Sequence, residues 1–261
     1  MMISRNIAGI KYYQFESLIF NKLTQAVFSR QGGVSPTPWK SLNLGSTVGD
    51  DPDRVQKNKD KLLDAIGYSS IQLSQVHQVH SAKVIVVTES NNNKSEFPQA
   101  DAMITNTPGI LLLMRFADCV PILMYDPVKK AAGIAHAGWQ GTVKEVSLTA
   151  AEEMEKQFGT NPSDLIAGIG PSIGPDHYQI GIDVIDKVKN TYRENWDQVL
   201  TIGPDDVKFN LWKANEISLR KAGVLNIETA GICTSCSGVD WFSHRGENGK
   251  TGRFAAVIGL K

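Results

Sequence analysis

Short runs of apolar residues, separated by turn residues, dominate the middle of the chain. Each run has the length of a strand and is bounded by glycine, proline or polar residues, a pattern that predicts buried β-strands. The predicted strands are residues 83–87, 109–114, 120–125, 129–136, 165–169 and 253–260.

Four other segments carry their apolar residues at helical spacing, which predicts amphipathic helices. Glycines follow three of them at the position where helices commonly stop: Gly67, Gly159 and Gly223. The predicted helices are residues 53–66, 142–158, 182–195 and 211–222.

Strands and helices follow one another without strict alternation, which favours an α+β fold over a doubly wound sheet. Only residues 129–169 have the order expected of a βαβ unit. No linker interrupts the chain, so residues 1–261 are predicted to form one domain. Residues 28–45 are predicted to be an irregular loop, and the polar, asparagine-rich residues 89–96 an exposed one.

The composition narrows the classes of function. The chain carries 27 basic and 27 acidic residues, which gives no support for binding to nucleic acid or to a membrane surface. No apolar run approaches the roughly 20 residues that span a bilayer, and the first residues lack the pattern of a secretory signal. Only 3 cysteines are present, too few for a disulfide framework. We therefore expect a soluble, cytoplasmic protein.

One thiol and two imidazoles carry the strongest chemical signal. Cys119, preceded by Asp118, stands at the entry of one predicted strand, and His136 ends the next. A hairpin would return His136 to the sheet edge where Cys119 lies. Adding His80 completes a His/Cys/His set, and three protein ligands with an open fourth position are the usual plan of a catalytic zinc site. A lone cysteine is more often a small buried hydrophobe.

The other histidines and cysteines are harder to place. Residues three apart on a strand point to opposite faces, so only one of His77 and His80 is expected to join the site, and His80 is the predicted ligand. Cys233 and Cys236 form a CxxC without a second such pair, which argues against a structural zinc site. They are predicted to lie in a loop near the site, with no role assigned.

Glycine-rich turns suggest where an anion would bind. The turn after His136 contains Gly138 and leads into a helix, so unpaired backbone N–H groups should face the same space. Trp139 is either a core residue or a stacking surface for a planar ring. Arg30 and Arg245 lie in glycine-rich loops, where arginines are usually solvated but can also clamp a phosphate.

A series of motifs resembles those of the YfiH family, also called the laccase-domain or multicopper polyphenol oxidase family. They are Arg-Gln-Gly-Gly-Val-Ser at 30–35 with Leu-Asn-Leu-Gly at 42–45, Gln-Val-His at 78–80, Ala-Asp-Cys-Val-Pro at 117–121, His-Ala-Gly-Trp at 136–139, Gly-Pro-Ser-Ile-Gly at 170–174 and Thr-Gly-Arg at 251–253. Each motif is weak alone, but together they are specific and span nearly the whole chain.

The resemblance implies an α/β/β/α layered α+β fold with mixed sheets, and a zinc ion held by His80, Cys119 and His136, which would also be the catalytic residues. The multicopper name does not suit the chain, because a laccase uses about ten histidines and only 5 are present. A single Cu²⁺ could occupy the same three residues, and polyphenol oxidase activity would then reflect metal loading.

The resemblance also implies purine nucleoside and phosphate as substrates. The implied reactions are phosphorolysis of inosine, guanosine, adenosine and methylthioadenosine, and hydrolytic deamination of adenosine. Candidate substrate- and phosphate-binding residues are Arg30, Asn43, Gly138, Trp139 and Arg245. The chain departs from the family at His244, where an aromatic residue is common.

Two other functions remain open at this stage. In a cysteine hydrolase that acts on a small amide such as a peptidoglycan precursor, Cys119 would be the nucleophile and His136 or His80 its base. The turn at Gly138 would then form an oxyanion hole. A metal-binding module without enzymatic activity is the third possibility, although several candidate anion donors around the triplet argue against it.

Overall fold

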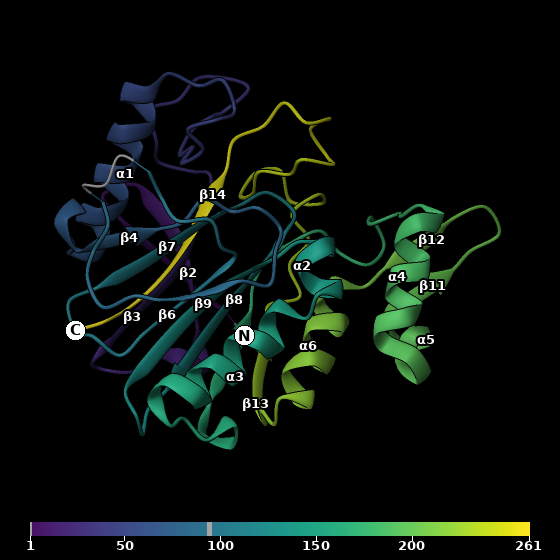
Figure 1. Cartoon of the computed structure of the whole chain (residues 1–261). Coiled ribbons are helices and arrows are strands. Elements are labelled where there is room, and N and C mark those ends of the chain that lie inside the picture. The colour runs from purple at the N-terminus through teal and green to yellow at the C-terminus, as the bar shows by residue number, and fades with distance from the viewer. Residues whose placement is uncertain (1, 93–95) are drawn as a thin grey trace.

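Two six-stranded β-sheets form the centre of the computed structural model, which describes residues 2–92 and 96–261 (Figure 1). The first sheet has the order β1 (Met2–Ile7), β2 (Ile10–Phe15), β3 (Leu23–Phe28), β14 (Phe254–Leu260), β7 (Leu111–Phe116) and β4 (Leu73–Gln75). The second has the order β13 (Asn226–Thr229), β10 (Ile166–Ile169), β8 (Val120–Asp126), β9 (Ala131–Ala137), β6 (Ala102–Thr105) and β5 (Val84–Val86). Parallel pairs β4–β7, β5–β6 and β10–β13 interrupt otherwise antiparallel neighbours, so both sheets are mixed.

Helices cover the outer face of each sheet. Helix α1 (Pro52–Ile66) packs Leu62 and Leu63 against the first sheet. Helices α3 (Val146–Phe158) and α6 (Leu211–Lys221) pack against the second. Between the sheets, side chains from both form a third buried cluster. The order of layers is therefore α/β/β/α, as the resemblance implied.

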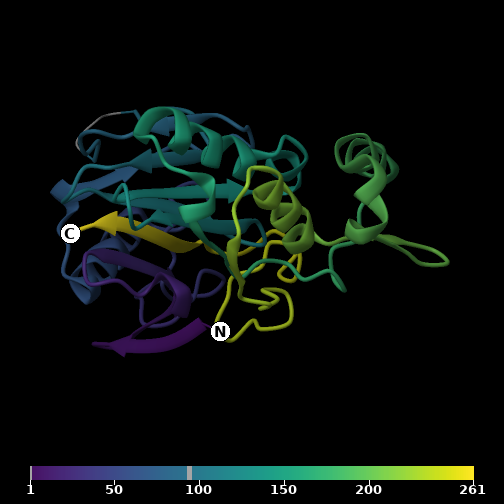
Figure 2. The same cartoon turned by 90° about the horizontal axis from the view of Figure 1, so that it is seen from below.

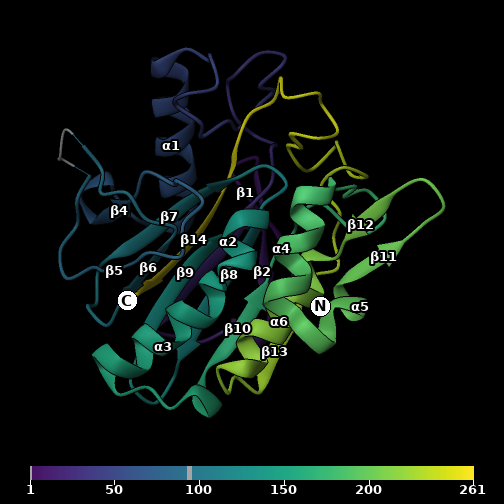
Figure 3. The same ribbon diagram turned by 45° about the vertical axis from the view of Figure 1, so that its right-hand side comes forward.

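The remaining elements lie mostly beside this sandwich. Figures 2 and 3 show α4 (Ile182–Tyr192) and the hairpin of β11 (Leu200–Ile202) and β12 (Val207–Phe209) on one side of the two sheets. The other remaining elements are α2 (Trp139–Val143), α5 (Trp196–Val199) and the 3₁₀ turns Glu16–Leu18, Ser70–Gln72, Pro162–Asp164 and Arg193–Asn195. No helix among the described residues is long and apolar enough to cross a membrane.

All six predicted strands are present within a few residues of their predicted bounds, and so are the four predicted helices. The helix predicted after Gly141 begins earlier, at Trp139, and is broken into α2 and α3 at Glu145, where φ is 55°. The βαβ prediction for residues 129–169 is confirmed. Strands β9 and β10 run in the same direction, and β8 lies between them, antiparallel to both. The single-domain prediction stays a prediction.

The prediction of an exposed loop at residues 89–96 is wrong at Asn91. This side chain is buried; its Oδ1 accepts the Gln75 N–H at 2.9 Å and its Nδ2 donates to the Gln75 carbonyl at 2.7 Å. Asn91 thus occupies the free edge of β4, where a polar side chain can replace a neighbouring strand. Residues 93–95 lie outside the described residues.

Candidate active site

A β-hairpin brings the predicted thiol and imidazole together. Strands β8 and β9 pair antiparallel, with Pro121 opposite His136. Cys119 directly precedes β8 and therefore lies at the same end of the sheet as His136. The predicted strand entry and the predicted return of His136 to this sheet edge are both confirmed.

Asp101, at the start of β6, positions the two histidines. It is fully buried, and its Oδ1 lies 2.9 Å from Nδ1 of His136. The same carboxylate accepts the backbone N–H groups of His80, at 3.0 Å, and Ser81, at 2.6 Å. Because Asp101 engages Nδ1, Nε2 is the nitrogen of His136 that is left to bind a ligand. Histidines that bind a metal through one ring nitrogen commonly donate the N–H of the other ring nitrogen to a carboxylate.

His80, Cys119 and His136 form a group whose ligand atoms all lie within 4.8 Å of one another. His136 is buried, Cys119 partly buried and His80 exposed, so one side of the group opens to solvent. Two imidazoles and a thiolate are donors that suit zinc or copper and leave a fourth position open. The three residues can therefore hold a metal ion.

Gly138 leaves the space that this group needs. A Cβ at this position would lie 2.8 Å from Sγ of Cys119 and 3.0 Å from Cδ2 of His80. The φ of Gly138 is −71°, which any residue can adopt, so the need for glycine is steric. Lys144, which follows α2, donates from Nζ to the His80 carbonyl at 2.9 Å and ties the helix to the histidine loop.

Three ionisable groups of the site, Cys119, His136 and Asp101, have shifted pKa values, and His136 interacts with both of the others. Burial opposes ionisation of the Cys119 thiol, but the neighbouring His136 outweighs it and lowers the pKa of Cys119 to about 6. Burial also opposes the charge on His136, yet Cys119 and Asp101 raise the pKa of His136 to about 9. Hydrogen bonds from His136 and Ser81 likewise outweigh burial and hold the pKa of Asp101 well below its usual range. Without a metal, the site carries a thiolate, an imidazolium and a carboxylate at neutral pH.

A pocket of about 260 Å³ adjoins the triplet. It is lined by His80, Asp118, Cys119, Gly138, Trp139, Gln140, Ile173, Tyr178 and Leu211. Trp139 is partly buried, and Nζ of Lys187 lies 5.1 Å from the centre of its ring. The pocket thus combines a thiol, an imidazole and two aromatic side chains.

Arg245 supports the pocket from outside its lining. Its backbone N–H donates to Oδ2 of Asp118 at 2.6 Å, and Thr234 donates its hydroxyl to Oδ1 at 2.7 Å. The guanidinium lies 5.2 Å from the centre of the Tyr178 ring and donates to the Gln179 carbonyl at 3.0 Å. Arg245, which was predicted to bind phosphate, therefore lies close to the pocket. One N–H group of its guanidinium is already bound to the Gln179 carbonyl.

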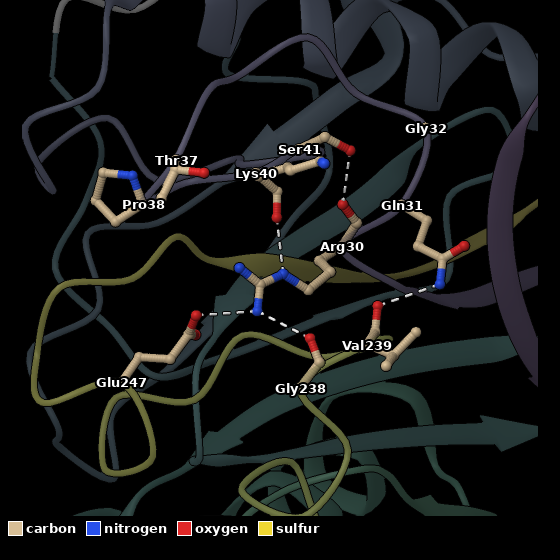
Figure 4. A pocket seen from close by; sticks show the side chains of 10 residues that line it. All are labelled: Arg30, Gln31, Gly32, Thr37, Pro38, Lys40, Ser41, Gly238, Val239 and Glu247. Atoms are coloured by element: carbon tan, nitrogen blue, oxygen red, sulfur yellow. Dashed lines mark hydrogen bonds and ion pairs between the residues drawn. The ribbon is translucent and has the colours of Figure 1, made fainter.

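Arg30 lines a different pocket, of about 540 Å³ (Figure 4). Its guanidinium donates to the carbonyls of Lys40, at 2.7 Å, and Gly238, at 3.0 Å, and to Oε1 of Glu247, at 3.0 Å. The structure does not bring Arg30 to the lining of the pocket beside Cys119.

Asn43 is also away from this pocket. It is fully buried, and its Nδ2 donates to Oδ2 of Asp50 at 2.9 Å. Its Oδ1 accepts the backbone N–H groups of Gly45, at 2.9 Å, and Arg253, at 2.8 Å. These contacts make Asn43 a link between two loops and leave it no exposed surface, which argues against the predicted role in substrate binding.

His77 is not in the metal-ligand group, but the expected reason was wrong. The segment is a loop rather than a strand, His80 has a φ of 58°, and the backbone of His77 pairs with Gln99.

Sequence reasoning missed Asp101 and Tyr178. The signal for Asp101 is a lone acidic residue between two alanines at the start of an apolar run. Tyr178 carries no comparable signal.

Comparisons with known proteins agree with this architecture. The sequence pattern of the family described as multi-copper polyphenol oxidoreductase laccase matches residues 24–261. The chain belongs to this family. Purine nucleoside phosphorylase YlmD of Bacillus subtilis (strain 168) is 34% identical over 250 residues, which cover 92% of this chain and 90% of that protein.

Two solved structures of the family resemble the chain over its whole length. YlmD from Geobacillus stearothermophilus is 32% identical and superposes with a TM-score of 0.93 over 100% of both chains. The Bacillus licheniformis hypothetical protein YfiH is 33% identical, with a TM-score of 0.92 over 99% of both chains. The predicted family and fold are thereby confirmed.

Proposed function

We propose that this protein is a zinc-dependent purine nucleoside phosphorylase. The observation that carries the proposal is the pocket that His80, Cys119 and Trp139 line together. Soft metal donors next to an aromatic face suit a planar, nitrogen-rich substrate. The name purine nucleoside phosphorylase, borne by relatives such as YlmD of Bacillus subtilis, adds support.

The residues of the pocket have distinct proposed roles. Trp139 would stack on the purine base. Burial raises the pKa of Tyr178 well above its usual range, so its hydroxyl stays protonated and can donate a hydrogen bond. Phosphate would bind between the turn at Gly138 and Arg245, on the side from which C1′ of the ribose is attacked. A phosphate oxygen would bond to C1′ as the bond from C1′ to the base breaks, giving ribose 1-phosphate, and the released base would take up the proton that the phosphate loses.

His80, Cys119 and His136 would hold the zinc ion, which when bound supplies Lewis-acid chemistry and lowers the pKa of water nearby. Asp101 keeps His136 in one tautomer and orientation. The same three residues would also hold Cu²⁺, and polyphenol oxidase activity would then come from the copper-loaded protein.

We further propose that the same pocket accepts guanosine, adenosine and methylthioadenosine, and that it deaminates adenosine with water. The chain lacks the His-x-Glu and Pro-Cys-x-x-Cys signature of zinc deaminases, so deamination would rest on the triplet. The cytoplasmic location also stays a prediction, supported by the three free cysteines.

The test is to incubate metal-quantified protein with inosine or adenosine, each with and without phosphate, and to separate the products by chromatography. Phosphate-dependent release of free base supports phosphorolysis, and inosine formed from adenosine supports deamination. His80→Ala and Cys119→Ala should abolish both, whereas His77→Ala is a matched control and should retain them. Intact substrates with fully zinc-loaded protein would refute the proposal.

A second candidate is a cysteine hydrolase. One observation favours it: His136 lowers the pKa of the Cys119 thiol, and Asp101 orients His136, which makes a nucleophile, a base and an orienting group. Such an enzyme would form a covalent adduct on Cys119 and would keep its activity in the presence of a chelator. A zinc enzyme would do neither.

A further inference from the structure

Three side chains that the proposed function does not use lie together outside the pocket. They are His177, in the loop after β10, and Cys233 and Cys236, in the loop after β13. Their ligand atoms all lie within 4.8 Å of one another, and both thiols are free. Among the described residues, this is the second group of soft ligands after the triplet.

The nitrogen–sulfur distances within this group are close to those of a tetrahedral zinc site. Zinc bonds of about 2.3 Å to sulfur and about 2.05 Å to nitrogen place the two donor atoms about 3.6 Å apart. Nδ1 of His177 lies 3.5 Å from Sγ of Cys236 and 3.9 Å from Sγ of Cys233. A metal could be bound with shifts of a few tenths of an ångström.

The fold holds these ligands in place through the backbone. Ser172 pairs with Cys233 in an isolated β-bridge, and the Thr234 N–H donates to the Ser172 carbonyl at 3.0 Å. The Gly174 N–H donates to Sγ of Cys233 at 3.2 Å, a hydrogen bond that a thiolate ligand accepts well. A Cβ on Gly174 would lie 3.2 Å from that sulfur, so this position favours glycine.

We propose that His177, Cys233 and Cys236 form a second zinc site, separate from the triplet, with its fourth position open to water. Two thiolates and an imidazole are a ligand set that zinc uses, and the cysteine spacing of the CxxC is the usual one. The site is partly exposed, so the ion can enter without unfolding.

A metal at this site would stiffen the wall of the pocket. It would join the loop that carries Ile173 and Tyr178, both of which line the pocket, to the loop that carries Thr234. Thr234 in turn donates its hydroxyl to Asp118, the neighbour of Cys119. The proposal concerns metal binding alone and does not depend on the proposed activity.

The test uses Cys119→Ser, which removes the only thiol of the triplet. Reduced, metal-free protein is titrated anaerobically with Co²⁺, and the near-ultraviolet absorption of cobalt–thiolate bonds is recorded. We expect this absorption to saturate at one Co²⁺ per chain and to disappear on addition of Zn²⁺. In the wild type, Co²⁺ should bind at two per chain.

Variants identify the ligands. Adding His177→Gln to Cys119→Ser should weaken cobalt binding at least tenfold, whereas His244→Gln, at another exposed histidine, should leave it unchanged. The proposal is overturned if Cys119→Ser shows no cobalt–thiolate absorption while thiol titration finds Cys233 and Cys236 free. It is equally overturned if these two thiols form a disulfide that persists under anaerobic reduction.

Discussion

Asp101 and His136 are joined by a hydrogen bond of 2.9 Å, and the same carboxylate binds the backbone of the loop that carries His80. The contact arises from the pairing of β6 with β9, which places Ala102 opposite Ala135. One buried carboxylate therefore positions two of the three residues that we propose as metal ligands.

Asp101→Asn should weaken metal binding by about 10- to 100-fold, the usual cost of losing such a supporting contact. The amide cannot accept hydrogen bonds with both oxygen positions, so the His80 loop and the His136 ring both lose part of their support. Zinc affinity, measured by competition with a chromophoric chelator, checks this prediction.

Asp126→Asn is the matched control. Asp126 is also fully buried, but it lies at the other end of β8, where its Oδ1 accepts the N–H groups of Val128 and Lys129. This variant should lose stability without losing metal affinity. Equal losses of affinity in both variants would show that Asp101 acts only through general stability.

The local parts of this site could be predicted from the sequence. Cys119 and His136 stand at the two ends of one hairpin, so their meeting follows from the pairing of consecutive strands. The turn at Gly138 follows directly in the chain. Apolar runs separated by turn residues predict these features, because each feature depends only on contacts between elements that follow one another in the chain.

The contacts of Asp101 and His177 with residues far along the chain could not be predicted from the sequence. Asp101 reaches His136 only because β6 lies beside β9, and His177 reaches the CxxC only because Ser172 pairs with Cys233. Such contacts follow from the order of strands in a sheet, which no periodicity reports. For the same reason the sequence did not reveal that Asn43 joins two loops through its contacts with Asp50 and Arg253.

Gly138→Ala should also impair metal binding, through steric exclusion. Its Cβ would lie 2.8 Å from Sγ of Cys119, closer than these atoms approach in proteins, and 3.0 Å from a carbon of His80, which is a tight contact. We expect a loss of zinc affinity of at least tenfold with little change in helical content. Gly238→Ala is the control, since a Cβ there meets nothing within 4 Å. Unchanged zinc affinity in Gly138→Ala would mean that the triplet binds its metal in another geometry.

Trp139→Ala should raise the KM for nucleosides by about 10-fold or more, because stacking of a base on an aromatic ring contributes about 1–3 kcal/mol. Trp139→Phe keeps an aromatic face and should retain most of the affinity. Steady-state kinetics at saturating phosphate measure both variants. Equal KM values in the Ala and Phe variants would place the base elsewhere in the pocket.

Metal removal should expose an unusually reactive thiol. The pKa of Cys119 is lowered from its ordinary value of 9.0 to about 6, against burial, by His136. In chelator-treated protein the alkylation rate of Cys119 should therefore rise through about pH 6 and be near its maximum at pH 7.5. The hydrogen bond with Cys233 raises the pKa of Cys236, so this second thiol should react only at higher pH.

Peptide mass spectrometry after brief treatment with iodoacetamide, from pH 5 to 10, follows both thiols in one sample. Zinc added back should protect Cys119, because a metal-bound sulfur is a poor nucleophile. Chelation should abolish phosphorolysis at the same time, and zinc should restore it. Full phosphorolysis in metal-free protein would refute the role of zinc, and metal-free hydrolysis of an amide that alkylation of Cys119 abolishes would instead support the cysteine hydrolase.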